Sequence, residues 1–314
     1  QWYRFSRNQN LDKQHLPKLG VAETVPGMRV FYDIGGRFCF NNVRVNGILP
    51  IDPEQGWYLL GMLNSVVVDF VFRRIAKPKA GGYLEANKQF IAPLPIPDAS
   101  AEDRAEVARR AKELQELHTR RRDLAAEIDQ RVDGDATDAD VRPWSFLWAD
   151  VKDVATLKGE APTDLKGPAL TAWAKAEQER RLEARLGSVQ ERMRPGAALS
   201  VQAGVDDVRF LADGVPIVTA FVSPAEAPFI AAQWRRIARD LNVTASTTAK
   251  SLVQSLLRLR RTSNVAVVEG VLDRDRQIAD LDARIAAAEA GMNDLVFRLY
   301  GLSAGERALV EGDR

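Results

Sequence analysis

Cysteine and histidine are scarce in this sequence of 314 residues, which holds one cysteine, Cys39, and two histidines, His15 and His118. A single thiol cannot form a disulfide within the chain, and these side chains cannot make a zinc site of the Cys/His type. We therefore expect neither a disulfide framework nor a metal centre. Hydrophobic residues make up 46% and charged residues 28%, which is enough for a sizeable core in roughly two domains.

Long hydrophobic segments are also missing. The main apolar stretch lies within residues 56–72, is broken by Asn64 and Asp69, and is too short and too polar to span a bilayer. No basic segment followed by an apolar one opens the chain, so no secretory signal is predicted. Together with the single cysteine, these absences favour a cytoplasmic protein with no membrane partner.

Neither sign of charge is in clear excess. Lysine and arginine number 44, aspartate and glutamate 43, and the formal net charge is +1. Bulk charge therefore does not indicate a nucleic-acid partner, and only a local concentration of basic residues could. Residues 1–100 have such a concentration, with twelve basic against eight acidic residues.

The residues that are present predict an α+β fold in four segments. Residues 1–99 are strand-rich, with a hairpin at 29–40 turned at Gly35-Gly36, a strand at 42–48, a mostly buried helix at 56–74 and an extended exit at 90–97 that three prolines keep out of a central strand. Residues 100–132 form one long helix. Residues 133–262 are a small mixed α/β segment, and residues 263–314 hold a heptad helix and a short cap helix.

Two helices have coiled-coil-like patterns. Apolar stripes recur at spacings of three and four on both, as a heptad seam does: Val107, Ala111, Leu114, Leu117, Leu124, Ile128 and Val132 on the first; Ile278, Leu281, Ile285, Ala288, Met292, Leu295 and Leu299 on the second. An antiparallel pair would bury both seams. The alternative is that each helix packs on the middle segment, where a hairpin over 199–222 and helices from Ser223 and Ala249 are predicted.

Two stretches resemble a known family. Residues 56–97, with Leu63-Asn64-Ser65, a basic glycine loop, Asn87-Lys88 and a proline-rich exit, are similar to the TaqI-like C-terminal specificity domain of adenine-specific DNA methyltransferases. Lys18-Leu19, residues 32–36 and residues 41–43 fit the same family, and residues 291–311 resemble its extreme C-terminus. Residues 135–260 match no pattern that we can assign.

The resemblance implies a target-recognition domain that binds double-stranded DNA in a restriction-modification enzyme. The parent enzyme would methylate the adenine N6 amino group with S-adenosylmethionine, with or without a fused endonuclease. Asn-Pro-Pro before an aromatic residue, which that chemistry needs, does not occur here, and no glycine-rich cofactor loop does. Because the chain begins with Gln1, we expect a piece of something longer. This chain is expected to have no catalytic residue, cofactor site or metal site of its own.

The candidate DNA contacts are basic, amide and aromatic side chains in the first domain. Arginine and amide groups are the types that bond guanine and adenine edges, whereas lysines beside a Gly-Gly loop suit a phosphate. The candidates are Arg4, Arg7, Asn8, Gln9, Asn10, Lys13, Lys18, Arg37, Lys77, Lys79, Tyr83, Asn87 and Lys88. Some have simpler explanations: Asn87 could cap a turn, Tyr83 could pack, and Cys39, between two phenylalanines, could be a small core residue.

A different function class remains open. Type I restriction specificity subunits also have a recognition domain that ends in Pro-Ile-Pro before a long helix. They normally carry two recognition domains, and only one copy is evident here, which favours the methyltransferase interpretation. The alternative is a specificity or interaction subunit that docks an upstream methyltransferase domain or subunit through its helices, with DNA contact of minor weight.

Overall fold

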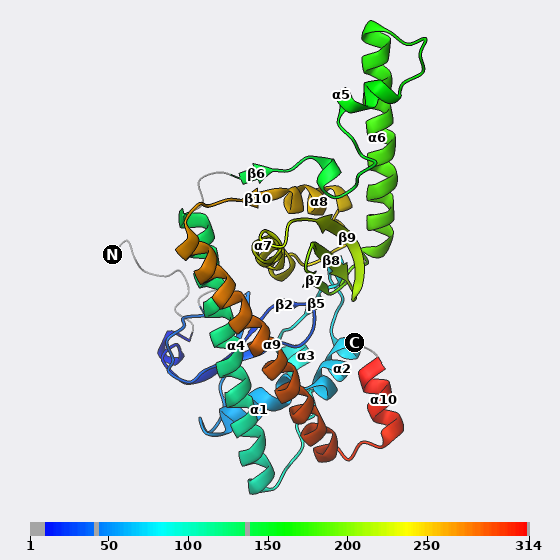
Figure 1. Ribbon diagram of the computed structural model, residues 1–314. Helices are drawn as coiled ribbons and strands as arrows, with labels where there is room; N and C mark the ends of the chain where they lie inside the picture. The colour runs from blue at the N-terminus through cyan, green and yellow to red at the C-terminus, as the bar shows by residue number, and fades with distance from the viewer. Residues whose placement is uncertain (1–9, 41–43, 136–138, 313–314) are drawn as a thin grey trace, which may run out of the picture. The chain divides into compact units, whose positions relative to one another are not determined.

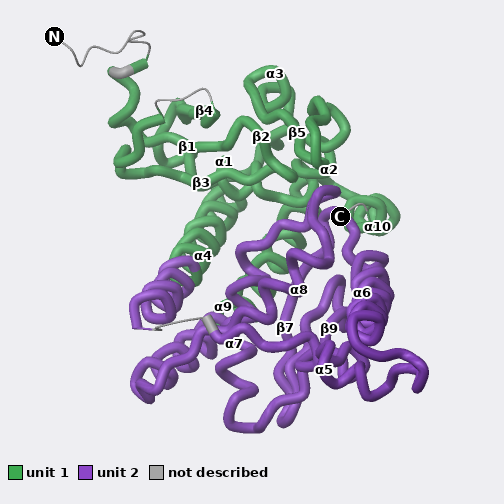
Figure 2. The backbone as a smooth tube through the Cα atoms, turned by 90° about the horizontal axis from the view of Figure 1, so that it is seen from above, with its two compact units in different colours: residues 1–121, 280–314 green, residues 122–279 purple. Residues whose placement is uncertain are grey.

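A computed structural model describes residues 10–40, 44–135 and 139–312 of the chain. The chain forms two compact units (Figure 2). Unit 1 consists of residues 1–121 and 280–314, and unit 2 consists of residues 122–279. Helices and antiparallel sheets are both present, which confirms the α+β class. No helix within the described ranges is long and apolar enough to cross a membrane.

Unit 1 contains two small antiparallel sheets. Strand β1 (Lys18–Ala22) lies between β3 (Val30–Asp33) and β4 (Val45–Ile48), and β2 (Thr24–Val25) pairs with β5 (Leu84–Glu85). The predicted hairpin at 29–40 is wrong, because β3 pairs with β1 instead of with the residues that follow it. The predicted strand at 42–48 corresponds to β4, which is shorter.

The predicted helix at 56–74 is two helices, α1 (Gln55–Leu63) and α2 (Val66–Ile75). Ser65 is extended between them, and its hydroxyl accepts a hydrogen bond from the backbone N–H of Val68, as an N-cap does. The Asn64 side chain instead bonds the N–H and the carbonyl of Val30 in β3, both at 2.8 Å. The Asn64 side chain, at the break between α1 and α2, therefore connects these helices to the sheet. A short helix, α3 (Lys88–Ile91), also covers the first two residues of the predicted extended exit at 90–97.

The two long helices, α4 (Ala101–Asp135) and α9 (Val265–Leu299), lie side by side and antiparallel (Figure 1). In unit 1 the ring of His118 lies 3.3 Å from Glu289, and Arg121 pairs with Asp282. In unit 2 Arg274 Nε lies 2.5 Å from a carboxylate oxygen of Glu127. The predicted antiparallel pairing is thus confirmed within each unit. The apolar stripes face inward, since the expected residues of both seams are buried or half-buried.

The core of unit 1 joins segments that are far apart in the sequence. Met62, Val68 and Phe72 from α1 and α2 are inaccessible to solvent, and they belong to one cluster with residues of α4, α9 and α10 (Ala304–Gly312). Two tyrosine hydroxyl groups bond backbone carbonyls of the proline-rich exit. Tyr58 Oη donates to the carbonyl of Pro97 at 2.7 Å, and Tyr300 Oη donates to that of Pro95 at 2.6 Å. Burial raises the pKa of Tyr300, so this donor stays protonated.

Unit 2 packs helices on a three-stranded sheet. The sheet has the order β7 (Leu199–Ala203), β8 (Asp207–Ala212) and β9 (Val215–Phe221), and a separate two-stranded pair joins β6 (Ala139–Val141) to β10 (Arg258–Arg260). The helices of unit 2 include the short α5 (Val154–Leu157) and the longer α6 (Gly167–Arg192), α7 (Ala227–Asp240) and α8 (Ala249–Leu257). The β8–β9 turn at Asp213-Gly214 and helix α8 agree with the predicted hairpin and helix, and strand β7 extends that hairpin.

Two elements of unit 2 differ from the sequence interpretation. Helix α6 was not predicted, because only Ala174 and Val189 on it are buried and no apolar stripe marks it. Helix α7 begins later than Ser223, whose hydroxyl bonds the Glu226 carboxylate at 2.8 Å in the turn before the helix. Helix α6 thus lacks an apolar stripe that could predict it, and the difference at α7 concerns only where the helix begins.

Candidate functional site

Four candidate contacts, Arg4, Arg7, Asn8 and Gln9, lie outside the described residues. The others belong to unit 1 and form two groups along the chain. The first group surrounds the turn after β3 and contains Asn10, Lys13, Lys18 and Arg37. The second group lies between α2 and α3 and contains Lys77, Lys79, Tyr83, Asn87 and Lys88.

Lys18 is not available to DNA, which corrects the sequence interpretation. It is 3% exposed, and its ammonium lies 2.8 Å from the equally buried Asp33 carboxylate. It also donates to the carbonyl of Gln14 at 2.6 Å and lies 5.0 Å from the centre of the Phe40 ring. Burial acts to raise the pKa of Asp33, but Lys18 and two backbone N–H donors outweigh it and hold that pKa below its ordinary value.

Asp33 shapes the turn that follows β3. Its two carboxylate oxygens accept the backbone N–H groups of Arg37 and Phe38, each at 2.9 Å. Gly36 has φ +58° and lies so close to the carbonyl of His15 that an added Cβ would stand 2.0 Å from that oxygen. Glycine is therefore required there. The turn leaves Arg37 exposed, and no ion pair of its guanidinium is found among the residues that the structure describes.

Lys13 and Asn10 lie beside this turn. Lys13 is exposed at the end of a 3-10 helix, Leu11–Lys13, and its N–H donates to the carbonyl of Asn10 at 3.1 Å. Asn10 itself is exposed with φ +60°, a conformation that asparagine tolerates better than most residues. Both side chains are therefore accessible, as a DNA contact requires.

The second group lies on and beside a narrow hairpin-like loop. The N–H of Glu85 donates to the carbonyl of Lys77 at 3.0 Å, and that of Lys79 donates to the carbonyl of Tyr83 at 2.7 Å. Gly81 and Gly82 form the tip with φ +75° and +80°, and an added Cβ on Gly82 would meet no atom within 4 Å. The tip is therefore open to solvent on that side, with room for a ligand to approach the backbone.

The five side chains of this second group differ in availability. Lys79 is tied to Glu23 at 2.9 Å, a hydrogen bond that raises the pKa of Lys79. Asn87 caps α3 by accepting the N–H of Gln89 at 2.9 Å, as the simpler interpretation expected. Tyr83 is half-buried. Lys77 and Lys88 are exposed, and neither has an ion pair within the described ranges.

The sequence interpretation missed a cluster of three exposed or half-buried phenylalanines on the sheet of unit 1. The Phe31 ring centre lies 5.9 Å from that of Phe38 and 5.8 Å from that of Phe40, and both pairs meet edge to face. Phe31 is 40% exposed and Phe38 is 53% exposed. Cys39 between them is also exposed, so the prediction that it is a small core residue is wrong.

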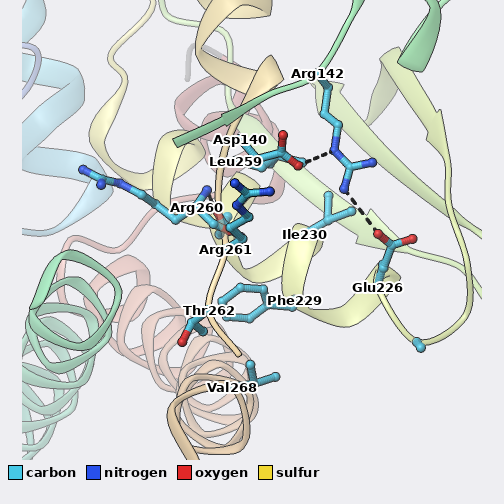
Figure 3. A pocket seen from close by; sticks show the side chains of 12 residues that line it. Asp140, Arg142, Glu226, Phe229, Ile230, Leu259, Arg260, Arg261, Thr262 and Val268 are labelled. Atoms are coloured by element: carbon cyan, nitrogen blue, oxygen red, sulfur yellow. Dashed lines mark hydrogen bonds and ion pairs between the residues drawn. The ribbon is translucent and has the colours of Figure 1, made fainter. Parts of the chain in front are cut away.

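Unit 2 contains a small open pocket of about 260 Å³ between α7, the β6–β10 pair and the start of α9 (Figure 3). Arg142 crosses its rim, with its Nε 2.9 Å from Asp140 and one terminal nitrogen 3.3 Å from Glu226. Phe229 and Val268 give the wall an apolar side. The guanidinium of Arg142 is thus neutralised by two carboxylates, whereas Arg260 and Arg261 add further positive charge to the lining.

Other chemistry is limited in what the structure describes. No group of three or more histidine, cysteine, aspartate or glutamate side chains suited to a metal ion occurs in residues 10–40, 44–135 and 139–312. Comparison with known proteins adds no assignment, since no family model, no curated protein and no solved structure matches the chain.

Proposed function

We propose that the chain is the DNA-recognition module of a restriction-modification type adenine methyltransferase, whose catalytic domain and S-adenosylmethionine site lie outside these residues. The chain has neither the Asn-Pro-Pro motif nor a glycine-rich cofactor loop, and the pocket of unit 2 offers no such loop either. In this proposal the cofactor is bound by the catalytic domain and not by these residues. In this proposal the module works in the cytoplasm on double-stranded DNA.

One observation supports the proposal above all. The two stretches that resemble the methyltransferase specificity region, residues 56–97 and 291–311, are about two hundred residues apart in the sequence, yet they share one hydrophobic core. Phe72 of the first stretch and Phe297 of the second are both buried in it, and α10 contacts α2. The part that resembles nothing, in contrast, forms most of unit 2. The resemblance therefore coincides with a structural unit.

The accessible lysines of unit 1 suit a phosphate backbone. Lys77 lies at the base of the loop that ends in the open Gly81-Gly82 tip, Lys88 begins the helix after it, and a tip with exposed backbone can approach a phosphate closely. Phosphate contacts position a protein on DNA without selecting a sequence. Recognition of a DNA sequence would then depend on other side chains of the same unit. Arg37, which is exposed on the turn after β3, is the arginine among the described candidates.

A salt titration of duplex binding tests the proposal. We expect the chain to bind a duplex weakly and with strong salt dependence, because phosphate contacts dominate in the absence of a partner domain. The double variant Lys77→Ala/Lys88→Ala should lower the slope of log affinity against log salt by about 0.9 for each phosphate that the protein no longer neutralises. Lys250→Ala, an exposed lysine of α8 in unit 2, is the matched control. An absence of duplex binding at low salt, or an unchanged slope in the double variant, would contradict the proposal.

A second candidate is a docking subunit that holds a methyltransferase through its helices. The antiparallel α4–α9 pair supplies the surface that this candidate would use, and that surface carries exposed charged side chains of both signs. Charge reversals on those surfaces, such as Arg109→Glu, would weaken association with the partner subunit and leave duplex binding unchanged if this candidate is right. The opposite pattern would leave the recognition module as the better account.

A further inference from the structure

The three phenylalanines of unit 1 lie on a sheet face that is built to receive them. Phe31 pairs with Gly20 across β3 and β1, and Gly20 pairs with Gly47 across β1 and β4, so the row beneath the rings carries no other side chain. A Cβ on Gly20 would stand 2.5 Å from the Phe31 ring and 2.7 Å from that of Phe40. The rings therefore rest directly on the backbone of the sheet.

The opposite face of the same sheet is already used. Leu19 and Val21 of β1 and Tyr32 of β3 are buried there, with 0%, 1% and 3% exposure. Within residues 10–40, 44–135 and 139–312 the phenylalanine face has no comparable cover, since Phe31 and Phe38 keep 40% and 53% of their surface exposed. Exposed aromatic groups in a cluster are more informative than single exposed apolar residues, because they mark a surface that another molecule covers.

The charges beside this face are mostly positive. Arg37 precedes Phe38 and is exposed without an ion pair among the described residues, and Lys13 is exposed nearby, where Gln14 bonds the backbone of Phe40. Lys18 lies beneath the Phe40 ring, but Asp33 neutralises it. Asp12 is the exposed acid of this neighbourhood within the described ranges. The exposed charges of Arg37 and Lys13 beside the rings are therefore compatible with a ligand that carries phosphate groups.

We propose that this face, made by Phe31, Phe38 and Phe40, stacks an unpaired base of DNA. Aromatic side chains on a sheet with basic neighbours are the groups on which splayed or single-stranded bases stack, because every base presents a π-face and the phosphates favour the cations. The inference rests on the proposed function. An enzyme that modifies a base must take it out of the duplex, and this disturbs pairing near the recognised site.

The test compares a single-stranded deoxythymidine oligonucleotide with a fully paired duplex, both fluorescently labelled, in anisotropy titrations with the full chain. Phe38→Ala removes the most exposed ring and should weaken single-strand affinity roughly 5- to 150-fold, the range measured for loss of one aromatic stacking partner. Phe38→Trp should keep the affinity near that of the native chain. Phe221→Ala is the matched control, since Phe221 is a 76% exposed phenylalanine of β9 in unit 2.

Each outcome decides between the two proposals. If the duplex binds and Phe38→Ala leaves single-strand affinity unchanged, the stacking inference is wrong and the recognition module stands. If neither DNA binds at low salt, the proposed function fails as well. If Phe38→Ala instead abolishes concentration-dependent self-association, measured by analytical ultracentrifugation, and leaves DNA affinity unchanged, the face is a contact between copies of the chain and the inference is overturned.

Discussion

The buried pair of Lys18 and Asp33 allows one prediction to be worked out in detail. Asp33→Asn removes the negative partner of an ammonium that is almost inaccessible to solvent. The amide also keeps a single acceptor oxygen, whereas the carboxylate serves Lys18 and the N–H groups of Arg37 and Phe38. An uncompensated charge and at least one orphaned N–H therefore stay buried. We expect the free energy of unfolding of unit 1 to fall by about 3–5 kcal/mol.

The reverse substitution and the double variant sharpen this prediction. Lys18→Met leaves Asp33 with its two backbone donors, which still stabilise the carboxylate, so it should cost less than Asp33→Asn. In Lys18→Met/Asp33→Asn no buried charge is left, and its cost should be smaller than the sum of the two single costs. Glu106→Gln, which breaks an exposed pair with Arg109 on α4, is the control and should change stability little.

Urea denaturation monitored by circular dichroism and by tryptophan fluorescence measures these differences, and repeating it at several pH values adds an independent check. Because the pKa of Asp33 is lowered in the folded chain, its contribution is fully present above the unfolded value of about 3.9 and is lost as pH falls through the folded pKa. The gap between native and Asp33→Asn chains should therefore narrow below about pH 4. Additive single costs at neutral pH would refute the argument that the pair acts as one buried unit.

Three further predictions concern packing and capping. Gly301→Ala should destabilise the end of α9 by about 1–2 kcal/mol in thermal unfolding, because φ is +65° there. Trp234→Ala should cost about 3–5 kcal/mol in urea denaturation, since Trp234 is fully buried and donates to the carbonyl of Leu256 at 3.0 Å. Leu117→Ala and Ile285→Ala should each cost about 2–5 kcal/mol and couple in a double-mutant cycle, because the α4–α9 ion pairs set a register that brings these seam positions to the same level.

Local signals in the sequence are enough to mark the ends of several helices. Ser100 accepts the N–H of Asp103 at 3.1 Å, and Ser303 and Glu306 bond each other's backbone N–H groups, which is the spacing of a capping box. Gly301 ends α9 in the left-handed conformation. These features depend on residues three or four apart, so a single sequence contains all the information that they need.

Predictions from local sequence patterns were wrong where contacts between distant residues determine the structure. The expected hairpin at 29–40 had alternating apolar residues around Gly35-Gly36, but β3 pairs with the earlier strand β1, with Lys18 opposite Asp33. The helix expected at 56–74 is interrupted because Asn64 bonds Val30 of β3. Partners this far along the chain are not visible in a periodic pattern.

The charges of the candidate site also could not be evaluated from the sequence alone. Counting cations in residues 1–100 identified a basic region, but the count treats Lys18 and Arg37 alike. In the fold Lys18 is neutralised by Asp33, and Arg37 is presented to solvent by a turn that the same aspartate organises. The buried pair thus removes one cation from any DNA contact and positions another. The exposed ring of Phe38 is carried by the same turn, so loss of Asp33 should impair both the proposed stacking face and its basic rim, even in chains that remain folded.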